Sequence, residues 1–468
     1  MENLFQVWDC LTYTEKEQII ELNRIIHPNE VKKQMLLELL SKHGKIDDRL
    51  FAKLIYNKSP DSAYSQLKKR LIEDLLGYII LFSQSKYPTH LRKWKDCQVM
   101  LLESQCLFTR GKEQMAKKML EKAYKESEKN EFYHLMLGAF ETEQKMCKSE
   151  KTIIPKDQNL ASIAKEYSDL LTTQAEVTKQ EKECRTYFIE NNEAEIIHKN
   201  PTHIRNLFWE KVANIQHDIH LRNFEDALNE INESKSLISD NTVLNHPIHT
   251  WEIHKLCNRI LMLQKDYYNA LIEAEKMVNI PGIHVDQKTE SEEKIWYALF
   301  HLGYYDKARC LLLKKIKEFK NIEWEQKKWN YLLSYLTYKE NSHKSALKLV
   351  HECQKSLKPI PEYSAGSRIL EAMILIDENE WDWLEYRMEN FRKLIYKFRC
   401  NSRQRLESCY HLIKWLQRNF SKPDINSLQK CGHFNLLKSE ENMYCWNPLD
   451  YELIRVDDWV EKKVMIFK

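Results

Sequence analysis

The fold is decided by the stretch His301-Leu302-Gly303-Tyr304-Tyr305-Asp306-Lys307-Ala308. A glycine at Gly303 suits a tight turn, because glycine adopts backbone conformations that other residues avoid. The aromatic Tyr305 can fill the wedge between two helices, and the small side chain of Ala308 allows two helices to cross closely. The stretch therefore predicts the turn of a helix–turn–helix unit, in which the second helix begins at Tyr305.

The same spacing recurs in the second half of the chain. The other copies, each an aromatic or histidine three positions before a small or apolar residue, are Phe224/Ala227, Tyr267/Ala270, His343/Ala346 and Trp381/Leu384. From Ala227 to Leu384 the successive anchors are separated by 43, 38, 38 and 38 residues, and Glu113/Ala116 marks a weaker, earlier copy. A fixed period in this range indicates a solenoid, because one helix pair cannot bury its apolar face alone. The helices that begin at the anchors are expected at 224–237, 267–278, 305–319, 343–354 and 381–398.

These anchors resemble the tetratricopeptide repeat, in which a small residue, an aromatic residue and an alanine straddle the turn between two antiparallel helices. The resemblance covers about residues 201–400 and is degenerate. Only one copy has the turn glycine, and the period exceeds the roughly 34 residues usual in the family. The resemblance implies an all-α fold, an α-solenoid of antiparallel helix pairs, and a groove for a peptide or protein that is lined by the first helix of each pair.

Composition supports a chain that is helical throughout. The 468 residues include 8 glycines and 11 prolines, well below average usage, whereas sheet proteins and dinucleotide-binding enzymes need many glycines in tight turns. A hydrophobic fraction of 43% with 11% aromatic residues supplies enough apolar surface for a folded core. The net charge of +3 favours neither an acidic nor a nucleic-acid partner by itself.

The pattern along the chain suggests four parts. Residues 1–85 read as a small N-terminal helical module, and residues 86–200 as longer helices with one long helix over 159–191. Residues 201–420 hold the repeats and a closing helix. The tail, residues 421–468, is expected to be irregular from Pro423 to Asn447, helical around Asp457–Lys463, and to cover the apolar end of the solenoid.

Motifs of catalysis and cofactor binding are missing from the sequence. It contains no GxGxxG, GxxxxGK[ST], GxSxG or HExxH pattern, so no catalytic or cofactor-binding residues are predicted. Soft metal ligands occur in the C-terminal part, as Cys409 with His411, Cys431 with His433, and Cys445. A zinc site would use such residues, but the CxH spacing places two ligands on different sides of a helix. Buried cysteines and ordinary histidines are the interpretation we adopt, and no metal is expected.

Two observations keep a nucleic-acid function open as an alternative. Residues 86–125 and 387–414 are rich in lysine and arginine, and the second stretch interleaves aromatic residues such as Tyr396. The helices expected around residues 50–56 and from Asp61, with Lys68, Lys69 and Arg70, are also spaced like a helix-turn-helix reader. Solvated outer faces of packed helices explain the same residues.

The leading hypothesis is a non-enzymatic interaction or scaffold protein that binds a peptide or protein in the groove. The residues nominated for partner binding lie on expected first helices of the pairs, where aromatic side chains dominate interface energies. They are Trp296, His301, Trp329, Tyr331 and Tyr335. A role of Trp296 and Trp329 as core residues remains the competing interpretation.

The expected location is cytoplasmic, with no membrane partner. No signal peptide is visible at the N-terminus, and the 12 cysteines form no CxxC pair. The longest apolar run, residues 75–82, is far shorter than the ~20 residues that span a bilayer.

Overall fold

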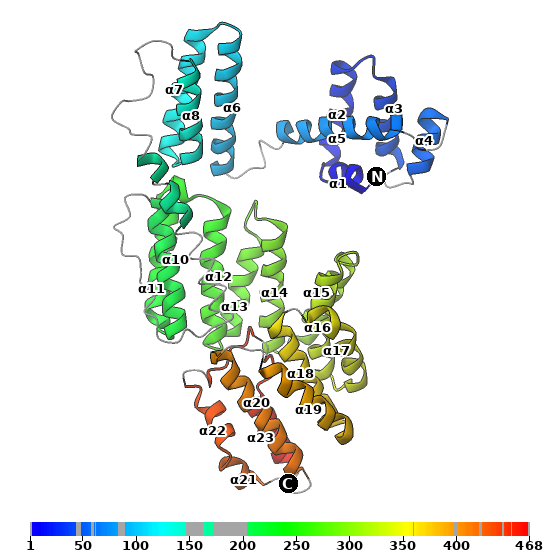
Figure 1. Ribbon diagram of the computed structural model, residues 1–468, viewed down its shortest axis with the longest axis vertical. Helices are drawn as coiled ribbons and strands as arrows, with labels where there is room; N and C mark the ends of the chain where they lie inside the picture. Colours follow the sequence, from blue (N-terminus) through cyan, green and yellow to red (C-terminus); the bar gives the residue numbers. More distant parts are fainter. Residues whose placement is uncertain are drawn as a thin grey trace. The chain divides into compact units, whose positions relative to one another are not determined.

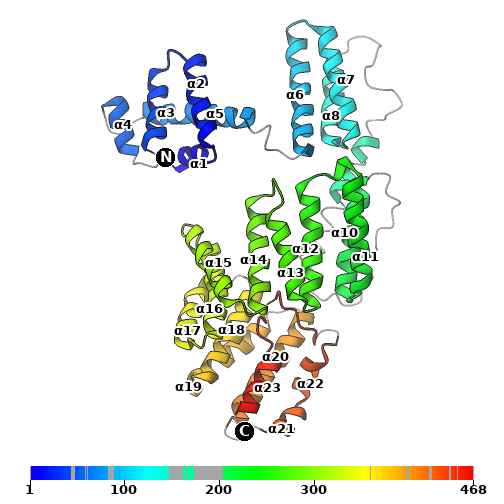
Figure 2. The same cartoon turned by 180° about the vertical axis from the view of Figure 1, so that it is seen from behind.

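The structure, a computed structural model, describes residues 2–43, 48–57, 60, 62–82, 89–146, 162–165, 167–172, 204–358, 360–396, 400–420, 424–441, 444–450 and 452–466. All regular elements in these ranges are helices (Figures 1 and 2), which confirms the all-α prediction. The chain divides into two compact units, Met1–Arg92 and Lys93–Lys468. No helix in the described ranges is long and apolar enough to cross a bilayer.

The first unit is built from five helices around its own core. They are α1 (Glu2–Asp9), α2 (Tyr13–Ile26), α3 (Val31–His43), α4 (Asp48–Tyr56) and α5 (Ser62–Phe82). A capping box begins α2, because Thr12 accepts a hydrogen bond from the backbone of Glu15 and the Glu15 carboxylate accepts one in return. The core includes Leu4, Trp8 and Phe51, so residues near the start of the chain are structural. The sequence analysis did not identify α1 and α2.

The second unit starts within α6 (Thr89–Thr109), at Lys93, and continues with α7 (Glu113–Lys129) and α8 (Tyr133–Met146). Helix α7 begins at Glu113, and Ala116 is fully buried, as expected for an earlier copy of the repeat. Of the long helix expected over 159–191, residues 162–165 and 167–172 are helical. The rest of that expected helix lies outside the described residues.

Five helix pairs follow and form the repeat array. The first helices are α10 (Ile204–Leu221), α12 (Pro247–Leu263), α14 (Val285–His301), α16 (Glu323–Lys339) and α18 (Pro361–Asp377). The second helices are α11 (Phe224–Asp240), α13 (Tyr267–Val278), α15 (Tyr305–Glu318), α17 (His343–Leu357) and α19 (Trp381–Ile395). A 3-10 turn, η2 (Thr242–Leu244), precedes α12. All five second helices begin at the predicted residue, and all five anchors, Ala227, Ala270, Ala308, Ala346 and Leu384, are fully buried.

The same backbone conformation ends the first helix of each of the five pairs. The residue two positions before the second helix has a positive φ, and these residues are Arg222, Lys265, Gly303, Asn341 and Asn379. The next residue then bonds back into the helix, as in Tyr304 N–H to the Leu299 carbonyl at 3.0 Å. This is the Schellman arrangement, which satisfies carbonyls that the end of a helix leaves free. The repeat therefore consists of a fixed turn geometry as well as a fixed packing position.

The array continues into α20 (Cys400–Asn419), α21 (Ile425–Gln429), α22 (Gly432–Ser439) and α23 (Val456–Ile466). Helix α23 lies beside α20 (Figures 1 and 2). The expectation of an irregular segment from Pro423 to Asn447 was wrong, because it contains α21 and α22. Asp424 caps α21 by accepting from the backbone of Asn426 and Ser427, and Leu428 and Leu437 are fully buried in the core.

Candidate functional site

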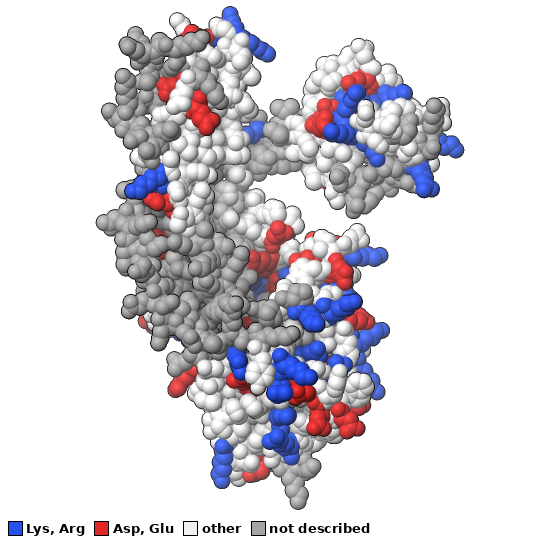
Figure 3. All heavy atoms as spheres, viewed as in Figure 1, with Lys and Arg blue, Asp and Glu red and all other residues white. Residues whose placement is uncertain are grey.

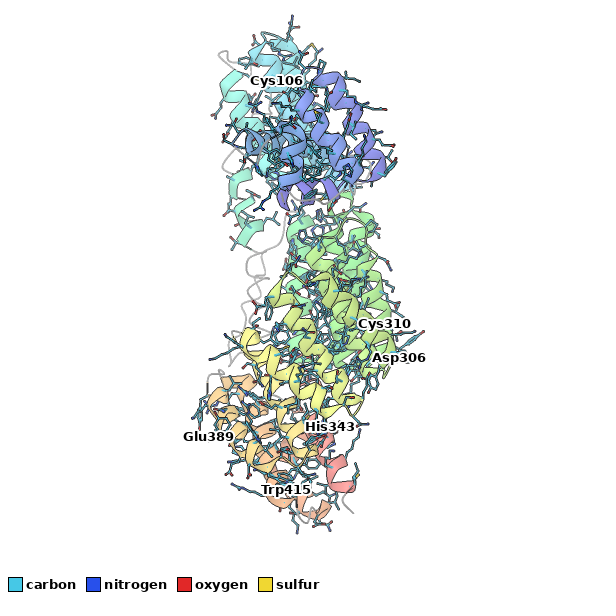
Figure 4. All side chains as sticks on the ribbon, turned by 90° about the vertical axis from the view of Figure 1, so that its right-hand side faces the viewer. Cys106, Asp306, Cys310, His343, Glu389 and Trp415 are labelled. Carbon is cyan, nitrogen blue, oxygen red and sulfur yellow. The ribbon has the colours of Figure 1, made fainter. Side chains whose placement is uncertain are left out.

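The first helices of the pairs lie next to one another and form what we call the inner face. Along it α10 packs on α12, α12 on α14, α16 on α18, and α18 on α20 (Figure 1). The second helices form the opposite, outer side, where Asp306 and Cys310 project away from α15 (Figure 4). A chain lying along the inner face could therefore contact several first helices at once.

The centre of the inner face holds a polar group of side chains around one carboxylate. Glu293 on α14 accepts hydrogen bonds from the hydroxyls of Tyr297 and Tyr363, each at 3.3 Å. Its other oxygen pairs with the ammonium of Lys328 on α16 at 2.8 Å. Three first helices thus supply groups to one carboxylate. We call the set the tyrosine cluster, and its members are Glu293, Tyr297, Lys328, Tyr331, Tyr335 and Tyr363.

Aromatic rings connect the cluster across α16 and α18. The ring of Tyr331 meets Tyr335 and Tyr363 edge to face, with centroids 5.4 Å and 5.2 Å apart. Tyr363 also meets Trp324 edge to face at 5.8 Å. The Tyr335 hydroxyl donates to the Gly366 carbonyl at 2.8 Å. Edge-to-face contacts of this kind stabilise one arrangement of the rings, so the cluster has a defined shape.

The electrostatics of the cluster follow from burial and from the carboxylates around it. Burial raises the pKa of all four tyrosine hydroxyls above its ordinary value, so at neutral pH they are hydrogen-bond donors. Burial by itself would lower the pKa of Lys328, but Glu293, Glu325 and Glu290 outweigh it and hold the pKa above its ordinary value. Lys328 therefore stays charged. The cluster offers hydroxyls, a carboxylate and an ammonium, which are groups suited to hydrogen bonding with a peptide.

Part of the cluster reaches solvent. Tyr331 and Tyr335 are buried, whereas Glu293, Lys328 and Tyr363 are half-buried. The half-buried Trp324 and Glu325 border them. A ligand would therefore meet the edge formed by these half-buried side chains first.

Four of the five nominated residues divide between this cluster and the core. Tyr331 and Tyr335 belong to the cluster, though both are buried. Trp296 and Trp329 are fully buried, and Trp296 stacks on Phe300 with ring centroids 5.1 Å apart. The positions of both tryptophans therefore agree with the competing interpretation, in which they are core residues. Their part in recognition stays a prediction, and in this conformation it would act through packing rather than direct contact.

His301 lies away from the tyrosine cluster, at the end of α14. Its ring stacks on Tyr267 at 4.8 Å and meets the edge of Trp446 at 5.6 Å. Burial lowers its pKa to about 4, an effect that Lys339 reinforces and that the Pro448 carbonyl opposes. His301 is thus neutral at pH 7, and its role as a partner contact likewise stays a prediction.

Sequence reasoning missed Glu293, Tyr297, Lys328 and Tyr363. A signal for two of them existed in the repeat register. Tyr297 and Tyr335 stand at the same distance before their anchors Ala308 and Ala346, and Glu293 and Tyr331 share a second register position. Aligning the first helices on the anchors would have placed these four aligned residues, two from α14 and two from α16, on one face. Tyr363 has no such counterpart, because it lies near the start of α18.

The C-terminal cysteines and histidines are not gathered into a metal centre. His411 and His433 stack with ring centroids 4.6 Å apart, and His433 shares a hydrogen bond with Ser408. Cys409 is buried, and burial raises the pKa of its thiol well above the ordinary value. Among the described residues, no group of three or more histidine, cysteine, aspartate and glutamate side chains is placed to hold a metal ion.

Several lysines and arginines of the basic stretches form ion pairs with neighbouring carboxylates. In the 387–414 stretch, Arg387 pairs with Glu371 and Arg392 with Glu389. In the 86–125 stretch, Lys117 pairs with Glu113. Figure 3 shows both signs of charge interleaved over the visible face of the lower part of the array. At these paired side chains, phosphate binding would have to compete with carboxylates.

In the first unit, the helix-turn-helix candidate corresponds to α4 and α5. Lys68 lies over the ring of Tyr64, with its ammonium 5.0 Å from the ring centroid. Lys69 and Arg70 are exposed. The turn between the two helices is described only at Asn57 and Pro60.

Comparison with known proteins finds structural similarity only. No protein-family model matches the chain, and no curated protein matches it in sequence. The crystal structure of the apo form of RapI is similar over 79% of this chain and 98% of that chain, with 12% identity and a TM-score of 0.41. A signal transduction ATPase of the STAND type with a tetratricopeptide repeat sensor, from Pyrococcus horikoshii, is similar over 93% of this chain, with 14% identity and a TM-score of 0.43. The match spans 65% of that ATPase chain.

Proposed function

We propose that the chain is a non-enzymatic interaction protein of the cytoplasm that binds a peptide or protein segment along its inner face, at the tyrosine cluster. The observation that carries the proposal is the placement of Glu293, Lys328 and the tyrosine hydroxyls at the junction of α14, α16 and α18. A structural core needs only apolar side chains at such a junction. A set of neutral donors with one carboxylate and one ammonium instead provides groups that can pair with the backbone and side chains of a ligand.

The residue types of the cluster also fit recognition. Tyrosine and tryptophan supply a large apolar area together with a polar tip, and they are enriched among residues that dominate interface energies. Trp324 and Tyr363 are half-buried and next to each other, so a ligand could cover them without any change of fold.

Selection of linear peptides from a random display library on the immobilised full-length chain tests this proposal. The selected peptides would then be titrated against the wild type and Lys328→Gln, which removes the ammonium that pairs with Glu293. We expect affinity to fall about tenfold, as for a residue at the centre of an interface. The matched control is Lys317→Gln on α15, where the side chain is exposed on the outer side, and its affinity should stay at the wild-type value.

Circular dichroism decides whether Lys328→Gln still folds, and Glu325→Gln provides a second variant that keeps the Glu293–Lys328 pair. Equal affinity of the wild type and both folded inner-face variants would rule out the tyrosine cluster as the binding site. Failure of any peptide to bind would remove the proposal altogether.

A second candidate function rests on exposed aromatic residues on α19 and at its C-terminal cap, and on an arginine of α20 beside them. Trp383, Tyr386 and Tyr396 are 58%, 62% and 60% exposed, and the Arg403 guanidinium lies 4.8 Å from the centroid of the Tyr396 ring. Such rings can stack on unpaired bases. This second function predicts that nucleic acid is recovered with the purified chain. Treatment with nuclease and the variant Tyr396→Ala should each abolish that recovery. The ion pairs of Arg387, Arg392 and Arg403 with glutamates favour a protein partner instead.

A further inference from the structure

The chain after α22 runs along the row of turns between the first and second helices. At the first turn the Arg222 guanidinium donates to the Trp446 carbonyl at 3.3 Å. At the second turn the Lys265 ammonium pairs with Glu440 at 2.9 Å and lies over the Trp446 ring, 5.9 Å from its centroid. These two turns belong to the α10/α11 and α12/α13 pairs. Residues after α22 therefore contact two helix pairs that lie roughly 175 to 224 residues earlier in the chain.

Residues further along the chain contact the ends of the next three first helices. At the end of α14, a ring nitrogen of His301 lies 3.4 Å from the Pro448 carbonyl. Near the end of α16, the Tyr338 hydroxyl accepts from the Trp459 indole at 2.8 Å. At the end of α18, Asp377 pairs with Lys463 at 2.6 Å. The described residues of 440–466, which we call the tie, thus contact all five pairs at the end of the first helix or at the turn after it. Glu440 and Trp446 contact the first two pairs, and Pro448, Trp459 and Lys463 contact the next three in chain order.

Buried interactions anchor the tie at its middle. Glu452 and Asp457 are 2% and 0% exposed. The Glu452 carboxylate accepts from the Arg405 guanidinium of α20 at 2.6 Å and from the Val456 backbone at 2.7 Å. Removing one partner from such a buried pair is strongly destabilising. The tie is therefore a permanent part of the second unit, and its contacts with the turns are held in place by α20.

Carboxylates of the tie lie near enough to the tyrosine cluster to act on its hydroxyls. The charge of Asp450 contributes to the raised pKa of Tyr297 and Tyr331, after the larger effect of burial. Glu452 contributes in the same sense at Tyr335. Carboxylates of the tie thus lie close enough to the inner face to influence its hydroxyls.

We propose that the tie fixes the curvature of the five helix pairs, so that the inner face moves as one body. In an ordinary solenoid each repeat contacts only its neighbours, and small rotations between repeats add up to changes of curvature. Here one segment is attached to every turn, so a rotation between any two pairs must break a contact with the tie. The inference goes beyond the proposed function, because it holds whatever the inner face binds.

Distance measurement across the array tests the tie in the full-length chain. Spectroscopic labels would be attached through unnatural amino acids at Glu225 on α11 and Glu385 on α19, which are exposed at opposite ends of the array. The wild type should give one narrow distribution of distances. Trp446→Ala removes the side chain that meets the second and third turns and should cause the loss of that narrow peak in favour of a broad distribution. The matched control Trp383→Ala removes an exposed tryptophan of α19 and should leave the narrow peak.

Should Trp446→Ala fail to fold by circular dichroism, the double variant Lys265→Ala/Lys463→Ala replaces it. That variant breaks two partly exposed ion pairs of the tie, at the second and fifth turns. A narrow, wild-type distribution in a folded tie variant would overturn the proposal. A broad distribution in the wild type itself would overturn it as well, because the tie would then not fix the curvature.

Discussion

At the scale of single residues, each turn of the array needs one residue with a positive φ, and only one of the five turns has glycine at that position. Gly303 has a φ of 77°, but Arg222, Lys265, Asn341 and Asn379 occupy the same position with φ between 59° and 66°. A residue with a Cβ is strained there by about 1 kcal/mol. The turn is thus maintained by its hydrogen bonds and by the packing on both sides, and glycine is favoured without being required.

Gly303→Ala should therefore lower the free energy of unfolding by about 1 kcal/mol. A Cβ at this position would meet no atom within 4 Å, so the cost comes from the backbone conformation alone. The matched control is Gly138→Ala within α8, where the added Cβ makes only an ordinary contact with Leu101 at 3.9 Å. That control should raise stability by about 0.5–1 kcal/mol, because alanine favours helix. Urea unfolding of both variants measures the two effects, and equal signs would contradict this account.

The lowered pKa of His301 predicts that the free energy of unfolding depends on pH. Burial lowers its pKa to about 4 in the folded chain, against an ordinary value of about 6.5. As pH falls from 6.5 towards 4, the unfolded chain takes up a proton that the folded chain does not. The stabilisation from this residue is therefore complete above pH 6.5 and falls by up to about 3 kcal/mol at pH 4.

Urea unfolding at pH 7, 6 and 5 checks this, with His301→Gln as the comparison. Glutamine can still donate to the Pro448 carbonyl but does not titrate. We expect the wild type to lose stability more steeply than the variant as pH falls. Parallel curves for the two proteins would show that His301 does not carry the dependence.

At the scale of elements, the close crossings at the anchors determine how the pairs pack. Ala308→Met should cost about 1–3 kcal/mol of unfolding free energy, because the larger side chain overpacks a fully buried position. Cys310→Met on the same helix is the control, since Cys310 is exposed and points outward (Figure 4). Thermal unfolding should show a lower midpoint for the first variant only. Similar midpoints for both would mean that Ala308 is not at a tight crossing.

The starts of the second helices were predictable and their ends were less so. The sequence at each turn specifies where the helix begins, so all five starts agree with the structure. The ends depend on tertiary packing. The helix from Trp381 stops at Ile395 rather than at residue 398, whereas the one from Phe224 continues past residue 237 to Asp240. The short α21 and α22 escaped prediction for the same reason, since a helix of one or two turns depends on its neighbours for stability.

Only part of the tyrosine cluster could be predicted from the sequence. Tyr331 and Tyr335 could be nominated together, because residues four apart share a face of one helix. Their partners Glu293 and Tyr363 come from α14 and α18, and the distance between first helices depends on the curvature of the whole array. The same limit hid the tie, whose contacts with Arg222 and Lys265 join segments that no local pattern relates.

At the scale of the whole molecule, the array combines a repeated surface with a fixed shape. The first helices provide an inner face with hydroxyls, a carboxylate and an ammonium at its centre. The tie meets each turn of the same array. A surface that does not need to change shape loses less entropy when it binds, which favours affinity. A rigid inner face is thus compatible with specific recognition of an extended chain.

Hydroxyl-radical footprinting of the full-length chain, with and without a selected peptide, tests the central claim most directly. The method reports the exposure of individual aromatic side chains. Peptide binding should protect Trp324 and Tyr363, which are half-buried at the edge of the tyrosine cluster, and leave Trp383 and Tyr386 of α19 as reactive as before. Protection of Trp383 and Tyr386 with no change at Trp324 and Tyr363 would place the partner on the outer side and contradict the account.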